Sequence, residues 1–431
     1  MNIYTVKQGD SLYAIAQEFG VSEQSLIAAN QLDYPDRLVV GQALVIESEP
    51  IVYEVRQGDS LYSISQRFGV TIPAILRANP EISYNQVIYP RQIIRIPSVP
   101  AYQRRVDVNG YAYPFITDET LSATLPFLTF ISIFSYSPRP NGSLIPINDN
   151  GVIATAKQRQ VAPLMVLTNF DESGNFSSEL ASEILRNPYA QDVLLNNIIR
   201  VMEEKGYYGL DVDFEYIARA DRRNYVAFLE KTVQRLHPLG YQVSTALAAK
   251  DSLEQEGPLT EGVDYRAIGE IVDMVLIMTY DWGYKYGPPM AVSPYNKVDQ
   301  AIAVAVSEIP HDKVLMGMPN YGYDWPLPYT SGVPASLIMN REAVNLAVNT
   351  GSEIRFDETA KSPYFYYNRS GRQHVVWFDD ARSFQAKLGL IEKYRLRGMG
   401  YWNINTLFLP GWLVLNSMYN VNIGKESPFK R

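Results

Sequence analysis

The sequence predicts an α/β protein: a (β/α)8 TIM barrel with a small α+β insertion between strand 7 and strand 8, preceded by two βααβ modules. Two observations predict this architecture. One segment at the start of the chain occurs twice, and from about residue 105 apolar strand-like runs alternate with helix-length stretches. The length of 431 residues agrees with several folding units, since a domain usually takes roughly 100–200 residues.

The repeat relates Tyr4–Tyr13 to Tyr53–Tyr62 at a constant offset, which also aligns Asn30 with Asn79. Each copy predicts a short strand, a tight turn at Gln-Gly-Asp, and a helix that stops at a glycine. A second helix and a closing strand complete each copy. Both copies are therefore predicted to be small βααβ units.

Each copy has an opening valine, a Gly-Asp-Ser-Leu turn and an asparagine after the second helix. On these residues the copies, at residues 2–47 and 51–97, resemble LysM modules. The resemblance implies binding of glycans that contain N-acetylglucosamine, such as chitin and peptidoglycan, in a groove between the first turn and the loop after the second helix. The Gly-Asp turn also caps a helix, so we expect it to serve both scaffold and groove. Because both copies keep these residues, two grooves are expected to add avidity on a polymer. The groove residues implied by position are Gly9, Asp10, Ser11, Leu12, Asn30 and Leu32 in the first copy, and Gly58, Asp59, Ser60, Leu61, Asn79 and Pro80 in the second.

Eight apolar runs separated by amphipathic stretches predict the parallel strands of the barrel, which is expected to occupy residues 103–431. The interval from Tyr323 to Val375 is too long for one crossover and contains strand-like patches of its own. It predicts an inserted subdomain at about residues 324–375. The eight runs are Val108–Tyr113, Leu128–Tyr136, Ala162–Asn169, Gly209–Glu215, Gln242–Ala249, Met274–Tyr280, Val314–Tyr321 and Gly398–Asn403.

The run Gly209–Glu215 alternates strictly, with Asp211, Asp213 and Glu215 on one face and apolar residues on the other. In a barrel strand the acidic face points to the interior. Three crowded carboxyl groups cannot all ionise cheaply, so we expect at least one to hold a proton near neutral pH. A carboxylic acid beside a carboxylate is what cleavage of a glycosidic bond requires. Two other interpretations are an edge strand with solvated acids and a metal site, which needs more ligands than the sequence places there.

Composition narrows the chemistry further. The chain has no cysteine and its three histidines lie far apart, which disfavours a zinc enzyme, a thiolate nucleophile or a histidine triad. The net charge is −8 without a basic run, so nucleic acid is not an expected partner. The 31 tyrosines supply flat faces with polar tips that suit sugar binding. We expect no membrane span, no classical signal peptide, and no cofactor or metal.

The acidic strand carries most of the signature Asp-x-x-Asp-x-Asp-x-Glu, and on it the barrel region resembles glycoside hydrolase family 18. Asp211, Asp213 and Glu215 match the last three acids, whereas Tyr208 replaces the first. The usual Ser-x-Gly-Gly of strand three is absent, and Leu167–Phe170 stands in its place. These departures indicate a subgroup of the family. Further matches to the family's strand motifs are Met278–Asp281, Gly317–Gly322 and Tyr401–Trp402.

The resemblance implies a role for each matching residue. Glu215 would protonate the departing glycosidic oxygen, and the substrate's own 2-acetamido oxygen would attack the anomeric carbon, with retention of configuration. Asp213 would hold the acetamido N–H and balance positive charge, Asp211 would tune Asp213, and Tyr280 would donate to the acetamido carbonyl. Further substrate-binding candidates are Asp281 for sugar hydroxyls, Trp402 as an apolar floor or simply a core residue, and Tyr113, Asn169 and Tyr321 at strand ends.

With both LysM-like modules included, the whole chain most resembles the spore cortex-lytic N-acetylglucosaminidases of endospore-forming bacteria. The resemblance implies a retaining β-N-acetylglucosaminidase that hydrolyses peptidoglycan during germination, at the cell wall and at the spore coat or cortex surface. We expect the chain to be a monomer. Muramic lactam in cortex lacks a free acetamido group, so cleavage after N-acetylglucosamine is the consistent choice. A chitinase acting on chitin oligomers is the alternative enzyme. A non-catalytic glycan-binding spore coat protein is the alternative of another class.

Overall fold

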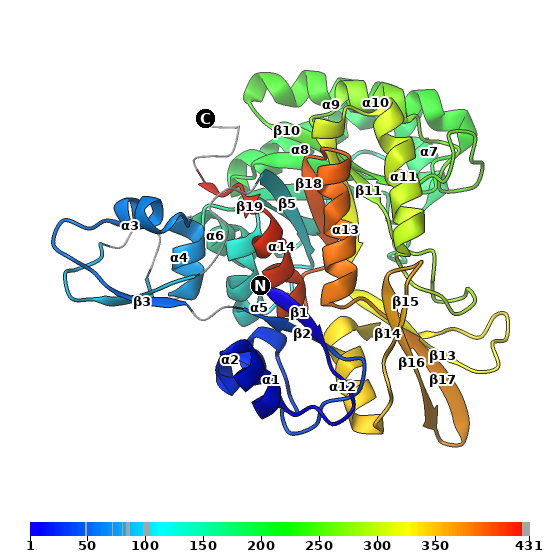
Figure 1. Ribbon diagram of the computed structural model, residues 1–431. Helices are drawn as coiled ribbons and strands as arrows, with labels where there is room; N and C mark the ends of the chain where they lie inside the picture. The colour runs from blue at the N-terminus through cyan, green and yellow to red at the C-terminus, as the bar shows by residue number, and fades with distance from the viewer. Residues whose placement is uncertain (48–49, 71, 80, 83–86, 98–103, 425–431) are drawn as a thin grey trace.

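The structure is a computed structural model, and it describes residues 1–431 except 48–49, 71, 80, 83–86, 98–103 and 425–431. It consists of a barrel, an antiparallel sheet inserted near the end of the barrel, and two small modules at the start of the chain (Figure 1). The predicted groove residue Pro80 and the predicted first and last residues of the barrel region, 103 and 431, lie outside the described residues.

Eight parallel strands form the barrel, and each coincides with one of the eight predicted runs. β5 pairs with both β18 and β6, which closes the sheet on itself, so the predicted TIM barrel is confirmed. The barrel strands are β5 (Arg105–Ala112), β6 (Phe130–Pro138), β8 (Ala162–Thr168), β9 (Gly209–Asp213), β10 (Gln242–Ala248), β11 (Met274–Met278), β12 (Val314–Pro319) and β18 (Gly398–Trp402), and short strands β7 (Leu144–Ile145) and β19 (Asn420–Val421) extend the sheet.

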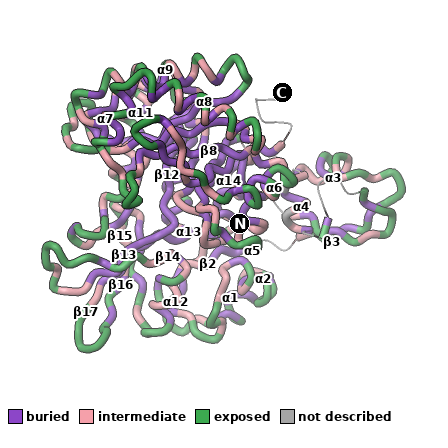
Figure 2. The backbone as a smooth tube through the Cα atoms, turned by 180° about the vertical axis from the view of Figure 1, so that it is seen from behind, coloured by how far each residue is buried: buried purple, intermediate pink, exposed green. Residues whose placement is uncertain are grey.

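Helices cover the outside of the barrel, and Figure 2 shows buried strands inside a layer whose outer side is exposed. The helix Pro188–Lys205 shows how the sequence fixes such an element. Asn187 caps it by accepting the Ala190 N–H, and Gly206 ends it in the left-handed conformation at φ 72°. The helices are α5 (Asp118–Thr124), α6 (Asn150–Gln158), α7 (Ser178–Leu185), α8 (Pro188–Lys205), α9 (Arg222–Leu236), α10 (Tyr265–Ile271), α11 (Tyr295–Glu308), α13 (Ala381–Lys393) and α14 (Leu409–Met418), with short 3-10 turns at Leu125–Phe127, Arg219–Asp221, His237–Leu239 and His311–Lys313.

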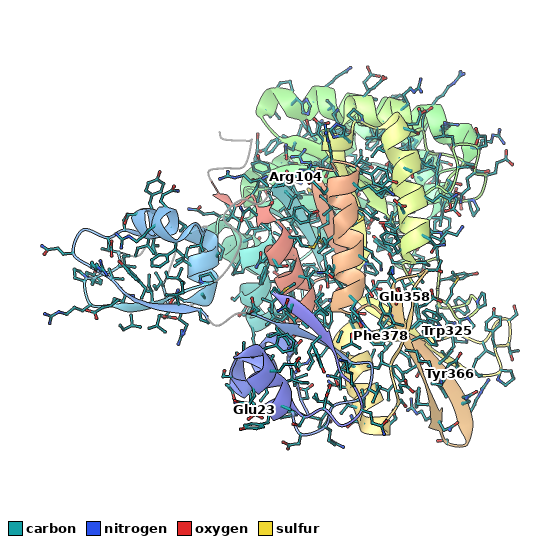
Figure 3. The ribbon with its side chains drawn as sticks, viewed as in Figure 1. Glu23, Arg104, Trp325, Glu358, Tyr366 and Phe378 are labelled. Carbon is teal, nitrogen blue, oxygen red and sulfur yellow. The ribbon has the colours of Figure 1, made fainter. Side chains whose placement is uncertain are left out.

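Arg104 fastens the start of the barrel to its far end. Its guanidinium donates to the Ile391 carbonyl at 2.9 Å and to the Leu396 carbonyl at 2.5 Å (Figure 3). These bonds tie the residue before β5 to the last turn of α13 and to the segment between α13 and β18. The first and last barrel strands are thus held together by side-chain as well as ladder hydrogen bonds.

The inserted subdomain lies between β12 and α13, where the sequence predicts it. Its sheet begins at Tyr321 and ends at Trp377, slightly wider than the predicted 324–375. The buried Trp325 and Phe378 belong to this region (Figure 3), and Ala343 and Ala347 let the insertion's helix approach the sheet closely. The elements are β13 (Tyr321–Pro326), β14 (Ser336–Met339), α12 (Asn340–Thr350), β15 (Arg355–Asp357), β16 (Ser362–Arg369) and β17 (Arg372–Trp377), in the antiparallel order β14-β13-β17-β16-β15.

The two repeats form the predicted βααβ units, here called module 1 (residues 2–47) and module 2 (residues 51–97). Ser11 and Ser60 cap the first helices, and Gly20 and Gly69 end them in the left-handed conformation. The same local sequence therefore builds both scaffolds. Module 1 contains β1 (Asn2–Thr5), α1 (Leu12–Phe19), α2 (Glu23–Asn30) and β2 (Ala43–Ile46), and module 2 contains β3 (Ile51–Glu54), α3 (Leu61–Phe68), α4 (Ile72–Ala78) and β4 (Ile93–Ile96).

Candidate active site

A cleft of about 600 Å³ opens at the carboxyl ends of the barrel strands, where TIM-barrel enzymes place their active sites. Acidic and aromatic side chains line it, together with the loop at residues 255–260. Six of the predicted residues line the cleft: Asp213, Glu215, Tyr280, Asp281, Trp402 and Tyr113. The lining also includes residues that the sequence did not single out as site residues: Phe134, Phe170, Phe176, Met278 and Trp282.

The acidic strand β9 lies in the middle of the closed sheet, between β8 and β10, so the edge-strand interpretation is wrong. Within the described part of the chain, no group of three acidic or histidine side chains is arranged to hold a metal ion. The three acids of β9 and of the loop after it have different surroundings, so their pKa values and hydrogen bonds differ.

The carboxyl group of Asp211 is buried, and both of its oxygens accept hydrogen bonds. The Tyr111 hydroxyl donates to Oδ2 at 2.7 Å, and the Ser244 hydroxyl donates to Oδ1 at 2.6 Å. Burial raises the pKa of Asp211, and these two hydrogen bonds oppose that shift because they stabilise the carboxylate. Asp211 does not line the cleft, so it acts from behind Asp213.

Asp213 is the unsatisfied acid of the group. Only 4% of the residue is exposed, and its Oδ1 is buried without a hydrogen-bond partner among the described residues. Burial, followed by the neighbouring Glu215 and Asp211 carboxyl groups, raises the pKa of Asp213 well above its usual range. An unpaired buried oxygen is costly, and this one lines the cleft, so a ligand N–H is the donor that would satisfy it.

Glu215 lies two residues beyond β9, whereas the sequence predicted it inside the strand. Asn169 holds it there: the Asn169 amide donates to the Glu215 carbonyl at 2.9 Å, and the Glu215 N–H donates to Asn169 Oδ1 at 2.9 Å. Burial, and then the nearby Asp281 carboxylate, raises the pKa of Glu215 to about 8. At neutral pH its side chain therefore carries a proton in the cleft, as a general acid must.

The raised pKa of Glu215 predicts a pH dependence of turnover. With Glu215 as the expected proton donor, its acid form is the active one, and turnover of a glycoside should persist at neutral pH and fall as pH rises through about 8. The measurement is the rate on a small glycoside from about pH 4 to 10, with thermal unfolding followed over the same range. A rate that declines already near pH 5, as for an ordinary carboxyl group, would contradict the assignment.

Tyr280 and Asp281 line the cleft from the loop after β11. Tyr321 does not line it, and its hydroxyl instead donates to Asp281 Oδ1 at 2.7 Å, which makes it a support for Asp281. Asp281 (φ 63°) and Tyr216 (φ 56°), which directly follow Tyr280 and Glu215, have left-handed backbones although neither is glycine. Such conformations are costly and cluster at functional sites, where the surrounding fold holds them.

Trp402 is partly exposed in the cleft and is fixed by rings packed against it. Phe134 contacts it edge-on, with ring centroids 4.8 Å apart, and Tyr113 and Tyr111 approach at 5.9 and 5.7 Å. The aromatic cluster therefore joins the cleft to Tyr111, the partner of Asp211. A rigid indole at this place suits an apolar sugar face.

Three predicted site residues, Asn169, Asp211 and Tyr321, thus stand behind the cleft and position the groups that line it. Of the two hydrogen-bond partners of Asp211, Ser244 could have been found from the sequence, because it occupies an alternating position on β10 directly beside Asp211. The cleft positions of Phe170 and Phe176 could not be predicted from the sequence, because a β-bridge in the loop after β8 brings these two residues together.

The hydrogen bonds of Asn169 predict that it is a positioning residue for Glu215. Asn169→Ala should lower kcat roughly 10–100-fold through misplacement of the acid, with little change in KM and a shifted alkaline limb of the pH profile. Steady-state kinetics on a small glycoside provide the measurement, with the exposed Asn175→Ala on the same loop as the matched control. An unchanged kcat, or a loss confined to KM, would contradict this role.

The predicted groove residues of the modules lie far from this cleft in the sequence and help to build their own scaffolds. Asn30 and Asn79 each join the second helix to the closing strand: Asn30 accepts the Val45 N–H at 2.7 Å, and Asn79 accepts the Arg95 N–H at 2.8 Å. Asp10 and Asp59 accept hydrogen bonds from the tyrosine that opens each copy. The turns at Gly9, Ser11, Gly58 and Ser60 remain exposed, whereas Leu12 is buried and Leu32 and Leu61 are partly buried.

Comparison with known proteins agrees with this geometry. The chain matches Glycosyl hydrolases family 18 over residues 123–406 and the LysM domain over residues 4–47 and 53–97. It is 40% identical over 429 residues to a cortical fragment-lytic enzyme of Bacillus subtilis, covering 98% of this chain and 99% of that one. It is 35% identical over 425 residues to a putative sporulation-specific glycosylase of the same organism, with the same coverage.

Among solved structures, the spore cortex-lytic enzyme of Bacillus megaterium superposes with a TM-score of 0.83 at 39% identity, covering 98% of each chain. No helix in the described residues has the length and apolar character of a membrane span. The family match takes in the acidic strand, the loop after β11 and Trp402, the elements that surround the cleft. The chain belongs to glycosyl hydrolases family 18 and carries two LysM domains.

Proposed function

We propose that this glycoside hydrolase is a retaining β-N-acetylglucosaminidase that cleaves peptidoglycan after N-acetylglucosamine, with the substrate's acetamido group as nucleophile. The observation that carries the proposal is the buried Oδ1 of Asp213, which has no hydrogen-bond partner among the described residues and lies beside Glu215, whose pKa is raised to about 8. A carboxyl oxygen that lacks a donor suits an acetamido N–H, and a protonated neighbour suits a leaving group.

The reaction begins with Glu215, which gives its proton to the glycosidic oxygen as the bond to the anomeric carbon breaks. The acetamido carbonyl oxygen attacks that carbon and closes an oxazolinium ring. Tyr280 donates to this oxygen and orients it, while Asp213 accepts the acetamido N–H and balances the positive charge. Water then opens the ring from the same face, losing its proton to Glu215, so the configuration is retained.

Asp211 supports this step electrostatically. Its two hydrogen bonds hold a carboxylate behind Asp213, and that carboxylate helps to raise the pKa of Asp213. When an oxazolinium forms, its positive charge favours the ionised form of Asp213, so the pair responds to the charge that develops in the reaction.

Peptidoglycan of the spore cortex is the polymer that the proposal favours, because the full-length relatives named above are cortex-lytic or cortical fragment-lytic enzymes. The LysM domains agree with association with the cell wall or cortex, and we propose that the chain acts as a monomer at the spore coat or cortex surface. A purely glycan-binding coat protein would not need an acid of raised pKa in its cleft.

Parallel digestion of purified cortex and of chitin, with mass analysis of the products, tests the proposal. Cortex should yield fragments whose new reducing end is N-acetylglucosamine, and the anomeric configuration of the first product should match the substrate. New reducing ends on muramic acid, or products from chitin alone, would contradict the assignment to peptidoglycan.

A further inference from the structure

The backbone hydrogen bonds of the two modules align them residue by residue. Val6 N–H donates to the Gln42 carbonyl at 2.9 Å, as Val55 N–H does to Gln92, and the side chains of Gln42 and Gln92 accept equivalent backbone N–H groups. In the loop before the closing strand and in that strand, position n of module 1 therefore corresponds to n plus fifty in module 2.

Module 1 is bonded to the catalytic body through the loop after its second helix. The Ile354 N–H donates to the Val40 carbonyl at 2.9 Å, and Arg382 donates to the Gly41 carbonyl at 3.0 Å. Earlier in the same loop, α12 and α14 supply additional donors. Arg341 and Asn345 donate to Asp33, each at 2.5 Å, and the Leu409 N–H donates to Gln31 at 2.7 Å.

The apolar contacts of module 1 also continue into the body. Val45, fully buried, belongs to the hydrophobic core of the barrel, and Val39 belongs to the core of the inserted subdomain. Gly41 lies so close to Ile354 that a Cβ there would come within 1.7 Å of the Ile354 carbonyl oxygen. Figure 1 shows module 1 against α12, on the side where the insertion emerges.

Module 2 has incompatible residues at the same positions. Arg91 replaces Gly41, Arg95 replaces Val45, and Tyr89, 63% exposed, replaces Val39. Its apolar core is a separate cluster, and the hydrogen bonds of Tyr53, Asn79 and Arg95 join parts of the module itself. It extends away from the barrel in both views (Figures 1 and 2).

Docking changes what each module can bind. The remaining crevice between module 1 and the body is lined by Asn30 and Leu32, two of its predicted groove residues, and measures about 30 Å³. A crevice of this size holds about two or three water molecules, so no sugar ring enters without breaking the interface. In module 2 the described part of the corresponding loop exposes Val87 and Tyr89, so the body does not cover these two residues.

We infer that the two LysM modules have divided their roles: module 2 alone captures the polysaccharide, and module 1 is a fixed part of the catalytic body. The inference rests on the proposed function only for the identity of the polymer. It replaces the sequence expectation of two equivalent grooves, because one of the two loops is already occupied. Capture is then monovalent in LysM domains, without the avidity that two free modules would give.

The capture arm of the test removes module 2. Ile51 and Ile96 are paired across β3 and β4, so a short Gly/Ser linker can replace residues 51–97 without moving the ends of the remaining chain. In a Glu215→Gln background, which leaves the polymer intact, the fraction of this variant retained on insoluble peptidoglycan or chitin should be at least about tenfold lower than that of the parent. Retention above half of the parent's would overturn the inference, because module 1 would then be a capturing module.

The body arm uses the internal repeat as its own control. Val45→Arg gives module 1 the residue of module 2 and buries a charge in the barrel core, so Tm should fall by roughly 5 °C or more. Arg95→Val makes the reverse exchange at the exposed site and should leave both Tm and retention unchanged. An unchanged Tm in Val45→Arg would overturn the fixed role of module 1.

The two arms separate this inference from the proposed function. Retention is measured without hydrolysis, so a chain that binds through module 2 but does not cleave cortex contradicts the proposed function alone. A chain that cleaves cortex but keeps its retention after loss of module 2 contradicts the inference alone. If the parent is retained on chitin but not on peptidoglycan, chitin is the polymer that module 2 captures, and the assignment of capture to module 2 stands.

Discussion

Glu215→Gln is expected to reduce hydrolysis by roughly 10²–10⁴-fold while leaving the fold and glycan binding intact. The amide has nearly the shape of the carboxyl group but no acidic proton to give to the leaving oxygen. The backbone of Glu215 is held by Asn169 through hydrogen bonds that the substitution does not touch. The loss should therefore appear in kcat, and the alkaline limb near pH 8 should disappear from what activity remains.

The measurement is steady-state turnover of a small N-acetylglucosaminide, with binding of a non-hydrolysed oligomer measured beside it. Glu254→Gln, an exposed glutamate on the loop after β10, is the matched control and should behave as the parent. More than a tenth of the parent's turnover in Glu215→Gln would remove Glu215 from the role of proton donor.

Asp213→Asn is expected to lower kcat by roughly 10²–10³-fold, although the side chain keeps its shape. The carboxyl group of Asp213 is buried and nothing else among the described residues bonds its Oδ1, so no neighbouring group can replace its charge. The amide cannot balance an oxazolinium. A thiazoline analogue of N-acetylglucosamine, which resembles that ring, should inhibit the parent competitively and bind Asp213→Asn much more weakly.

Inhibition constants for the thiazoline in both proteins, together with kcat, test this second result. Asp312→Asn, at an exposed position before β12, is the control for the chemical change alone. A glycosyl ester trapped on an aspartate or glutamate would contradict the scheme, since substrate assistance leaves no covalent bond to the enzyme.

Most of the architecture was determined by patterns that are local in the sequence. The eight strand-like runs predicted every barrel strand, because the face of a barrel strand that packs against the helices needs apolar residues, which in β9 alternate with the acids. The repeat predicted both modules, since helix caps and left-handed glycines act within a few residues. The alternation of Asp211 and Asp213 placed two acids on one face of β9, because the period of a strand is two.

Only the tertiary structure decided how the acids differ and what each module does. Asp211 accepts hydrogen bonds from Tyr111 and Ser244, whereas Asp213 Oδ1 has no partner in the described part of the chain, yet both acids follow the same alternation in sequence. Val45 and Arg95 occupy one position of one repeat, but whether that position meets the barrel or solvent depends on packing between distant segments. Burial and hydrogen bonding set the pKa of a carboxyl group, and burial decides whether a surface is open to a ligand. Both depend on residues that are near in space but distant in sequence, so a sequence pattern does not determine them.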